Sequence, residues 1–490
     1  MRYISTRDNS PALFSAQAID LGMVPAGGLF VPEQIPQLPS VDPGESYQQV
    51  AVKVLSSFLS DFSPEEVTSC VENAYSLGGF DSPEVVDLTG IGNKRYVMEL
   101  WHGPTAAFKD VALQIMPHFM KYAKVKSGND SHTVILVATS GDTGKAALEG
   151  FKDVGGISIV VFYPHGGVSE IQRLQMATTD GKNTHVVAVK GNFDDCQSGV
   201  KALFGDEEFR ASAKKDNVVF SSANSINWGR LCPQIVYYVK SYLDLVKRKE
   251  IARGDKVDFC VPTGNFGNIL AGYYAKEMGL PIRKLVCASN KNKVLTDFFR
   301  TGVYDRNRSF HRTMSPSMDI LISSNLERFL FEVTGHDASK VNQWYAQLSQ
   351  KGEFTVDDAF REKTESLIQA EWVNESEVLQ TIGDTYRECR YVLDTHTAVA
   401  VAAANRLKDD TPVVIASTAN PYKFSGDVLK GLGSGKPLNE FESIEKLNYT
   451  SDMPIHRAVG GLKEKPVRHD EVIGIGQMRD TVQNIIRSFR

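Results

Sequence analysis

The stretch Thr133-Val-Ile-Leu-Val-Ala-Thr-Ser-Gly-Asp-Thr-Gly144 decides the fold class. Its β-branched and apolar first half predicts a buried strand, and its polar, glycine-containing second half predicts a turn into the alanine-rich helix that follows. Residues 157–162 and 185–189 repeat the strand pattern, with a helix expected between them at 168–178. Because alternating strands and helices are typical of parallel βαβ units, the sequence predicts an α/β protein with a doubly wound sheet.

A second set of strand and helix patterns lies further along the chain. Residues 258–262 and 284–288 are typical of buried strands, and a helix that ends near Met278 separates them. The pattern closes with a helix at 397–407 and a strand at 412–416. Each first strand of a unit ends in a polar turn. Since ligands of parallel α/β sheets gather beyond the carboxyl ends of the strands, we expect the functional site in these turns.

Changes in pattern along the 490 residues predict about two or three domains. Residues 1–94 form an N-terminal domain, residues 95–435 a core, and residues 436–490 a turn-rich C-terminal segment that wraps the surface. Within the core we expect a smaller lobe at about 120–205 and a polar, helical insertion at about 300–390. Further helices are expected at 48–62, 64–75, 111–122, 338–348 and 356–371.

The composition argues against several classes of partner. The formal net charge is −5, without a long block of like charge, which gives no electrostatic footprint for nucleic acid or an anionic membrane. No apolar run reaches the roughly 18 to 20 residues of a membrane span, and the residues from Met1 to Asp8 lack the apolar stretch of a signal peptide. We therefore expect a cytoplasmic protein without nucleic-acid or membrane partners.

The cysteines and histidines give no sign of a metal site. The six cysteines are scattered, and Cys260 and Cys287 lie in apolar runs, so we expect them to be reduced core residues. The sequence contains no C-x-x-C pair and no H-E-x-x-H motif, and the ten histidines do not cluster at ligand spacing. We predict no metal.

The segment His102-Gly-Pro-Thr-Ala-Ala-Phe-Lys-Asp110 places Lys109 among apolar and small residues at the start of an expected helix. Desolvation disfavours an ammonium and lowers its pKa from about 10.4. A lowered pKa suits an amine that forms a Schiff base with a carbonyl. The alternative is a lysine that extends its amine to solvent from a helix start.

Two strand-to-helix turns could bind anions. Gly264-Asn-Phe-Gly-Asn268 contains no basic residue, so it would hold a phosphate through backbone N–H groups and the helix dipole; a tight turn without a ligand is the alternative. Ser140-Gly-Asp-Thr-Gly-Lys145 resembles a Walker loop, but Thr139 and Ala146 break the required spacing. This second turn could bind a carboxylate or a pyridine oxygen, or it could simply cap the helix.

The shielded lysine, the non-basic phosphate cradle and the polar turn together suggest a cofactor with both an aldehyde and a phosphate. Pyridoxal 5'-phosphate has both groups. In such enzymes the protein holds the ring and aims the substrate, while the ring supplies the electron sink. Ser417 and Thr418, at the end of the last expected strand, could offer a hydroxyl to the ring nitrogen.

Motifs across almost the whole chain carry a resemblance to a known family. The chain resembles the threonine synthases of the longer bacterial and fungal subgroup, which have the fold-type II, tryptophan synthase β-like, pyridoxal-phosphate fold. The motifs are 3–7, 27–33, 102–110, 138–144, 166–176, 224–230, 262–268, 318–325 and 416–424.

The resemblance implies roles for particular residues. Lys109 is the Schiff-base lysine, and Thr418 is the hydroxyl residue near the ring nitrogen. The phosphate cradle consists of Gly264, Asn265, Phe266, Gly267 and Asn268. The candidates for the substrate carboxylate are Ser140, Gly141, Asp142 and Thr143. The candidates for the remaining substrate groups, each with an alternative interpretation as a cap or a surface ion pair, are Ser169, Arg173, Asn227 and Arg230.

Three positions depart from the pattern. Many fold-type II relatives have Asn where Asp142 stands, although this subgroup commonly has Asp. Thr395 stands where Pro is expected, which changes a turn. Asn420 stands where His is expected, close to Thr418, and could alter the surroundings of the ring nitrogen.

The resemblance implies an enzyme that converts O-phospho-L-homoserine and water into L-threonine and phosphate. This β,γ-replacement is the last step of threonine biosynthesis, and the enzyme is expected to be a monomer or homodimer. A phospho-lyase that releases 2-oxobutyrate from the same substrate is the nearer alternative. A non-catalytic relative that binds a small ligand or a partner is the more distant one, and the intact Lys109 argues against it.

Overall fold

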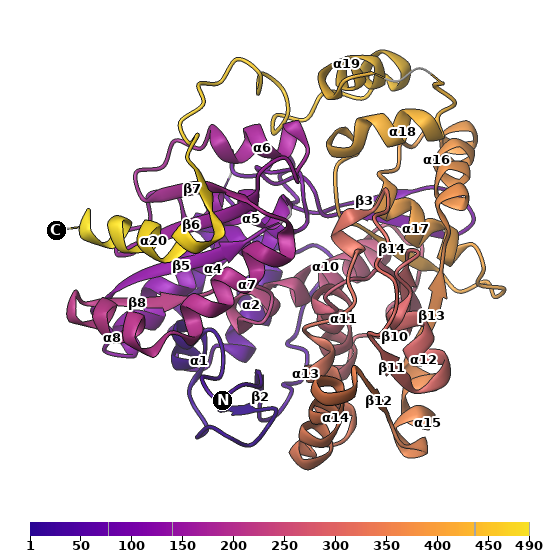
Figure 1. Cartoon of the computed structure of the whole chain (residues 1–490). Helices are drawn as coiled ribbons and strands as arrows, with labels where there is room; N and C mark the ends of the chain where they lie inside the picture. The colour runs from indigo at the N-terminus through magenta and orange to yellow at the C-terminus, as the bar shows by residue number, and fades with distance from the viewer. Residues whose placement is uncertain (77, 140, 436–437, 490) are drawn as a thin grey trace.

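The computed structural model describes residues 1–76, 78–139, 141–435 and 438–489, and two large β-sheets organise them (Figure 1). The larger, six-stranded sheet has the strand order β13 (Ile368–Trp372), β10 (Ile282–Ser289), β9 (Val257–Pro262), β14 (Val413–Ser417), β4 (Arg95–Glu99) and β3 (Asp87–Gly90). Neighbouring strands are parallel except for β3 and β4, which are antiparallel.

The smaller sheet is parallel throughout. Its five strands have the order β15 (Val472–Gly474), β7 (Thr184–Lys190), β6 (Ile157–Pro164), β5 (His132–Ala138) and β8 (Val218–Ser221). Every residue of β6 and of β9 is buried. Strands that are buried along their whole length have cover on both faces of the sheet, and helices provide it here.

The helices divide into three groups along the chain. The first group is α1 (Ser15–Leu21), α2 (Tyr47–Phe58), α3 (Pro64–Ala74), α4 (Lys109–Lys126), α5 (Asp142–Phe151), α6 (Glu170–Ala177), α7 (Phe193–Gly205) and α8 (Glu207–Lys215). The second is α9 (Trp228–Leu231), α10 (Pro233–Lys247), α11 (Gly267–Glu277), α12 (Val294–Thr301), α13 (Leu326–Val333), α14 (Ala338–Lys351) and α15 (Asp358–Leu367). The third is α16 (Glu375–Cys389), α17 (Thr395–Ala404), α18 (Ser425–Gly431), α19 (Glu440–Ser451) and α20 (Met478–Arg487).

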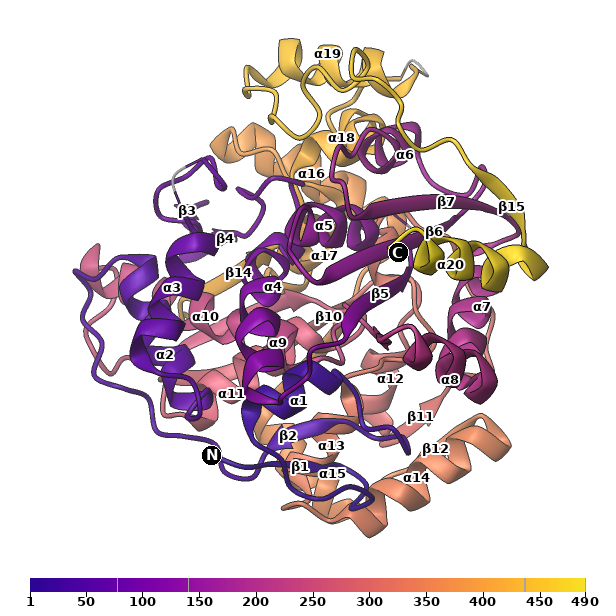
Figure 2. The same ribbon diagram turned by 90° about the vertical axis from the view of Figure 1, so that its left-hand side faces the viewer.

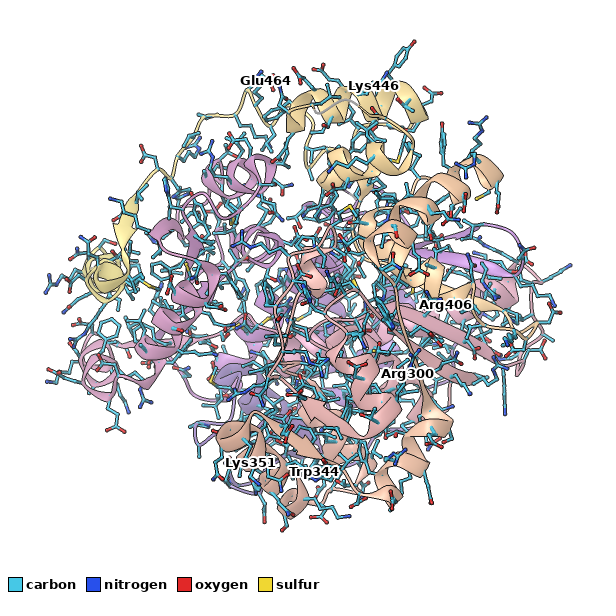
Figure 3. All side chains as sticks on the ribbon, turned by 45° about the vertical axis from the view of Figure 1, so that its right-hand side comes forward. Arg300, Trp344, Lys351, Arg406, Lys446 and Glu464 are labelled. Atoms are coloured by element: carbon cyan, nitrogen blue, oxygen red, sulfur yellow. The ribbon has the colours of Figure 1, made fainter. Side chains whose placement is uncertain are left out.

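The N-terminal region combines helices with a small antiparallel pair, β1 (Tyr3–Ser5) and β2 (Phe30–Pro32). Ser46 and Ser63 cap α2 and α3, and each forms a capping box with the residue three positions later. Both helices bury an apolar face in the same core as the larger sheet. The charged side chains labelled in Figure 3, such as Arg300 and Arg406, lie at the periphery.

The predicted α/β pattern is confirmed in its main elements. The strands expected at 133–138, 157–162, 185–189, 258–262, 284–288 and 412–416 are β5, β6, β7, β9, β10 and β14, with ends displaced by two residues at most. The helices expected at 64–75, 168–178 and 338–348 are α3, α6 and α14. Among the described residues, none of the helices combines the length and apolarity that a membrane crossing needs.

The helix predicted at 356–371 is wrong in its last part. Helix α15 ends at Leu367, and the next five residues form β13, which pairs in parallel with β10. The strand buries Ile368 and Ala370 at alternate positions, which is the strand period rather than the helix period. Pairing at the edge of the sheet therefore overrides the local helical preference.

Two further parts contain more β-structure than expected. The insertion at 300–390 includes an antiparallel pair, β11 (Val303–Asp305) and β12 (Glu353–Thr355). The C-terminal segment does more than wrap the surface, because it crosses from α19 to the smaller lobe (Figure 2) and adds β15 beside β7. Met478, Val482 and Ile486 of α20 then join the core of that lobe. The domain boundaries at 94 and 435 stay predictions.

The order of the strands brings the ends of separate motifs together. Strands β9, β14 and β4 are neighbours and run in the same direction. Their carboxyl ends lead into the turn at 263–268, into Thr418 and into the Lys109 segment, respectively. The functional site is therefore expected at this edge of the larger sheet, facing the smaller lobe.

Candidate active site

Backbone contacts fix Lys109 beside Thr418. The Phe108 N–H donates to the Thr418 carbonyl at 2.9 Å, and Ala107 and Ala419 form an antiparallel bridge. Ala106, with a φ of 60°, turns the chain immediately before Lys109 begins α4. The small side chains in this segment allow the two backbones to approach. The predicted Schiff-base lysine and the predicted ring-nitrogen hydroxyl are thus brought together.

The amine of Lys109 is held in a desolvated position. Its side chain is 10% exposed, and its Nζ lies 3.7 Å from Asp142 Oδ2 and 5.0 Å from the centre of the Phe108 ring. Burial lowers the pKa of Lys109 to about 8; Asp142 opposes this shift, and the cations Lys423 and Arg230 add to it. An amine with this pKa can be neutral in a useful fraction of molecules near neutral pH, as covalent catalysis by lysine requires.

Asp142 makes contacts in several directions at the start of α5. Its Oδ1 lies 2.7 Å from Lys423 Nζ and accepts from Gln172 Nε2 at 3.1 Å, and its Oδ2 accepts from Ser317 Oγ at 3.3 Å. Burial alone would raise the pKa of Asp142, but Lys423 and Lys109 hold it well below its usual range. Asp142 is therefore an ionised carboxylate enclosed by protein.

Lys423 is a site residue that the sequence interpretation did not assign. Its side chain is fully buried, and its Nζ also donates to the Thr105 carbonyl at 3.0 Å. It lies in the short 3₁₀ helix η2 (Pro421–Phe424) directly after Thr418. The available signal in the sequence was the position of this lysine: it stands between two aromatic residues, in the motif that also contains Thr418.

The turn at Gly264–Asn268 has the form of an anion cradle. Phe266 adopts a left-handed conformation, with a φ of 65°, at the N-cap of α11. A Cβ at Gly264 would lie 2.9 Å from the Ser317 carbonyl oxygen, so this position requires glycine. The Asn265 carbonyl accepts from the Asn325 N–H at 3.0 Å. These contacts fix the backbone, while the first N–H groups of a helix lack acceptors within the helix.

Asn268 supplies a specific sign that the cradle fits a phosphate. Its Oδ1 accepts from the hydroxyls of Tyr237, at 2.8 Å, and Tyr238, at 2.7 Å. These two bonds orient the amide, and its Nδ2 is buried without a hydrogen-bond partner among the described residues. A buried donor without an acceptor is costly, and a phosphate oxygen would satisfy it. The cradle therefore fits the phosphate of pyridoxal phosphate.

Arg230 is the best placed of the predicted substrate residues. It is 6% exposed, and its Nη1 donates to the Ala223 carbonyl at 2.7 Å. Burial lowers its pKa to about 10, and its charge influences the Lys109 amine. Within the described ranges, no ion pair joins Arg230 to a carboxylate. A buried cation without a counter-ion is suited to an anionic ligand.

The other predicted residues beyond the cradle have structural partners. Asn227 caps α9 and also donates to the Ile19 carbonyl, at 3.1 Å. Ser169 caps α6 by accepting from the Gln172 N–H at 3.2 Å, and Arg173 pairs with Glu170 at 2.7 Å on the surface. These contacts match the alternative interpretation of caps and surface ion pairs. A role for Asn227, Ser169 or Arg173 in substrate binding stays a prediction.

The turn before α5 is only partly described. Ser140 lies outside the described residues. The Gly141 N–H donates to Thr139 Oγ1 at 3.0 Å, and Thr143 is half-buried in the first turn of α5. Gly141 has a φ of 138°, and the side chain of Gln172 fills the space that a Cβ would need. The close packing of Gly141 and Gln172 explains how α6 reaches Asp142.

The insertion contributes Ser317, which the sequence interpretation also missed. The Ser317 N–H donates to His396 Nε2 at 3.1 Å, while its Oγ contacts Asp142. Because Nε2 accepts, the His396 proton is on Nδ1, which lies 3.1 Å from Asp394 Oδ2. His396 is therefore a member of a buried network that ends at Asp142.

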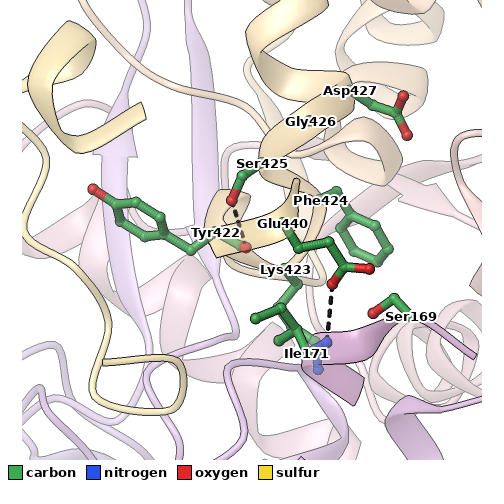
Figure 4. Close-up of a pocket in the computed structure, with 9 residues that line it drawn as sticks. All are labelled: Ser169, Ile171, Tyr422, Lys423, Phe424, Ser425, Gly426, Asp427 and Glu440. Carbon is green, nitrogen blue, oxygen red and sulfur yellow. Dashed lines mark hydrogen bonds between the residues drawn. The ribbon is translucent and has the colours of Figure 1, made fainter. Parts of the chain in front are cut away.

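A cavity of about 190 Å³ lies beside Lys423, between α6, η2, α18 and the start of α19 (Figure 4). The carboxylate of Glu440 reaches across it and accepts from the N–H groups of Glu170 and Ile171, each at 2.9 Å. A carboxylate at a helix N-terminus is favourable, because it satisfies free N–H groups and the helix dipole. Glu440 thereby links α19 to the smaller lobe.

Together, the shielded amine of Lys109, the anion cradle at Gly264–Asn268 and the adjacent Thr418 fit a pyridoxal-phosphate-dependent enzyme. Comparison with known families agrees. The family described as "Pyridoxal-phosphate dependent enzyme" matches residues 82–418. The family "Threonine synthase N terminus" matches residues 2–75, and the family "Threonine synthase, C-terminal" matches residues 397–484.

Individual relatives point to the same family. Threonine synthase-like 1 of Macaca fascicularis is 40% identical over 485 residues, covering 93% of this chain; the chain spans only 64% of that relative's length. Threonine synthase of Schizosaccharomyces pombe is 39% identical, covering 89% of this chain and 90% of the relative. A crystal structure of threonine synthase with bound pyridoxal phosphate, from Brucella melitensis, is 35% identical with a TM-score of 0.87, and covers 100% of this chain and 99% of that one.

The chain belongs to the threonine synthase family, and its fold is the fold-type II pyridoxal-phosphate fold that its sequence predicted.

Proposed function

We propose that this chain converts O-phospho-L-homoserine and water into L-threonine and phosphate, the last step of threonine biosynthesis, with pyridoxal phosphate as its cofactor. Membership of the threonine synthase family supports this activity. The observation that carries the proposal is the position of Arg230, a buried cation with no carboxylate partner among the described residues, near the shielded amine of Lys109. A phosphorylated amino acid offers a phosphate to Arg230 and an amino group that can take the place of the Lys109 amine.

The proximity of Lys109, the cradle and Thr418 supports their assignment to the cofactor. Lys109 would bind it covalently, the cradle from Gly264 to Asn268 would hold its phosphate, and the Thr418 hydroxyl would face its ring nitrogen. When bound, pyridoxal phosphate supplies an electron sink for charge that develops on the substrate carbons. A neutral hydroxyl cannot hold the ring nitrogen protonated as a carboxylate would. Proton placement by the protein then matters more.

Lys109 is the proposed proton carrier. When its amine is not bound to the cofactor, Lys109 would be free to act as a general base toward the substrate Cα. The pKa of Lys109, about 8, lies close to neutral pH, and general base catalysis is most effective when the pKa of the base is near the working pH. The same amine can return a proton further along the substrate chain and finally release the product.

The substrate needs groups for its carboxylate and its phosphate. Arg230 is the proposed ligand of the phosphate, because its charge is buried and unpaired by carboxylates in the described part of the chain. The turn from Ser140 to Thr143 is the proposed site for the carboxylate, where N–H groups at the start of α5 favour an anion. Ser169, Arg173 and Asn227 are weaker candidates, since they already have partners.

Other features of the proposal remain predictions from the sequence. The chain is expected in the cytoplasm, which agrees with six cysteines that are all free. It is expected to act as a monomer or homodimer. We also retain the division into residues 1–94, 95–435 and 436–490. Closure of the two lobes over the substrate is expected, because water would divert the reaction toward 2-oxobutyrate.

The test is a product assay run with a lysine variant. The protein with pyridoxal phosphate and O-phospho-L-homoserine should release threonine and phosphate in equal amounts. Release of 2-oxobutyrate alone would make the chain a phospho-lyase. Lys109→Ala should lose turnover and the visible absorption of the bound cofactor while keeping its fold. Lys121→Ala, at an exposed position of the same helix, is the matched control and should behave as the parent.

A further inference from the structure

Asp142 lies near two lysines, Lys423 and Lys109, which have different proposed roles. The Asp142 carboxylate has two lysines within reach, and the distances to them are unequal: 2.7 Å to Lys423 Nζ but 3.7 Å to Lys109 Nζ. Lys423 is fully buried and also donates to the Thr105 carbonyl, at 3.0 Å. The carboxylate is thus paired with a lysine that has no covalent role, and it only approaches the one that has.

We propose that Lys423 is a positioning residue for the reaction, the counter-ion that keeps the Asp142 carboxylate from approaching the Lys109 amine to hydrogen-bond distance. The inference rests on the proposed function only in giving Lys109 a covalent role. An amine engaged by a lone carboxylate stays an ammonium, and an ammonium is neither a nucleophile nor a base. With Lys423 in place, Asp142 can orient the amine through its second oxygen without fixing its proton.

The charges around the amine support this assignment. Those that face Lys109 in the described structure are Asp142 from α5, Lys423 from η2, Arg230 from α9 and Asp110 from its own helix. Asp110 is turned away from the amine, since its oxygens accept from Thr105 N at 2.8 Å and from Thr105 Oγ1 at 2.6 Å. Asp142 is therefore the one carboxylate among these groups that can bind the amine directly.

The remaining neighbours of Asp142 cannot replace Lys423. Gln172 and Ser317 donate to the two carboxylate oxygens at 3.1 and 3.3 Å, but both are neutral. If Lys423 were absent, Lys109 would be the nearest cation to a buried carboxylate. The carboxylate would then raise the pKa of Lys109, because an opposite charge within about 4–6 Å favours the charged form.

The attachment of Lys423 explains why it can hold this position. Its Nζ joins η2 to the Thr105 carbonyl in the Lys109 segment and to Asp142 at the start of α5. These contacts tie the edge of the larger sheet to a helix of the smaller lobe. A lysine fixed at both sides keeps its distance from Lys109 when the substrate amine exchanges with the protein amine.

The test measures how fast the full-length chain, stripped of cofactor, binds pyridoxal phosphate at different pH values. Binding requires the neutral amine, so the pH midpoint of the rate reports Lys109, and the plateau rate reports access to the site. The titration of pyridoxal phosphate itself is common to all variants. No substrate is present, so the result does not depend on which reaction the enzyme catalyses.

Lys423→Met should raise the midpoint by about one unit or more above that of the parent, which is expected near 8. Asp142→Asn should lower it. The double variant Asp142→Asn/Lys423→Met should stay close to Asp142→Asn, because Lys423 acts through a carboxylate that this variant no longer has. Lys430→Met, at an exposed lysine of α18 that pairs with Asp427, is the matched control and should leave the midpoint unchanged.

An unchanged midpoint in Lys423→Met would overturn the proposal. So would a double variant raised as far above Asp142→Asn as Lys423→Met is raised above the parent, because Lys423 would then act independently of Asp142. Circular dichroism separates these results from loss of the fold. If Lys423→Met does not fold, Lys423→Gln takes its place: its midpoint should lie above that of the parent, and a midpoint at or below the parent value would reject the role of Lys423.

Discussion

The Phe108 N–H donates to the Thr418 carbonyl at 2.9 Å, and this backbone bond joins two parts of the proposed cofactor site. Phe108 precedes the lysine proposed to bind the cofactor covalently, and Thr418 carries the hydroxyl expected at the ring nitrogen. Because the bond uses main-chain atoms, the Thr418 side chain can be changed without releasing the Lys109 segment.

Thr418→Val should therefore keep the fold and the covalent bond to the cofactor, while lowering kcat by about tenfold. The loss of one hydrogen bond of roughly 1 to 1.5 kcal/mol corresponds to a factor of this size. Steady-state kinetics and the position of the visible absorption band measure the effect. Thr418→Ser, which retains the hydroxyl, should recover most of the activity; equal losses in both variants would contradict a role for the hydroxyl.

Gly264→Ala should weaken cofactor binding. The new Cβ would lie 2.9 Å from the Ser317 carbonyl oxygen, so the cradle or the facing segment has to move. Overpacking of this kind costs about 1–3 kcal/mol, which corresponds to a rise in the Kd for pyridoxal phosphate of about tenfold or more. Gly44→Ala, where a Cβ meets no atom within 4 Å, is the control. A Kd at the parent value in Gly264→Ala would show that the cradle does not hold the phosphate.

Arg230→Met should lower kcat/KM for O-phospho-L-homoserine by about 100-fold or more, since truncating a buried, hydrogen-bonded charge at a binding site costs about 2–5 kcal/mol. The variant should not lose stability, because it removes a buried charge that has no carboxylate partner in the described structure. Kinetics and the thermal midpoint are measured together. In Arg173→Met, which removes an exposed ion pair with Glu170, kcat/KM should change little. A larger loss of kcat/KM in Arg173→Met than in Arg230→Met would assign the substrate phosphate to Arg173.

His102 should make stability depend on pH above neutrality. It lies 2.6 Å from Asp81 and 2.9 Å from Glu99; burial opposes its charge, but these carboxylates raise its pKa to about 9. A raised pKa means that the stabilisation is complete below the unfolded value of about 6.5 and is lost as the pH rises through about 9.

The measurement compares the parent with His102→Gln at pH 7 and pH 10. The variant should be less stable at pH 7, by about 3 kcal/mol for a broken buried pair, and the difference in thermal midpoint should narrow at pH 10. His165→Gln, at an exposed histidine, should show no such difference. An equal difference in thermal midpoint between the parent and the variant at both pH values would mean that His102 stabilises the fold through packing alone.

Much of the fold could be predicted because its strands are marked locally. Strands β5, β6 and β9 are apolar runs that end in polar turns, and burial on both faces gives them an unambiguous pattern. Strand β13 could not be predicted, since Ile368–Trp372 follows a helical pattern without a break and becomes a strand only by pairing with β10. The position of β15 depends in the same way on a distant partner, β7.

The site could be predicted where its chemistry lies in continuous motifs. Lys109, the cradle at 264–268 and Thr418 each follow a strand, and the order of the strands brings them together. Lys423, Ser317 and His396 were missed because their importance comes from contacts that the sequence does not contain, such as the pairing of Lys423 with Asp142. Arg173 pairs with Glu170, three residues earlier on α6, which matches the ion-pair alternative; its role in substrate binding stays a prediction.

The most direct test of the proposed reaction is turnover of O-phospho-L-homoserine in water labelled with ¹⁸O, followed by mass spectrometry of both products. Elimination breaks the carbon–oxygen bond, so the released phosphate should keep its original oxygens, while water that adds at Cβ should place the label in the hydroxyl of threonine. Label in the phosphate would indicate simple hydrolysis of the phosphate ester, and unlabelled phosphate with 2-oxobutyrate in place of threonine would indicate a phospho-lyase. Either result would contradict the function proposed here.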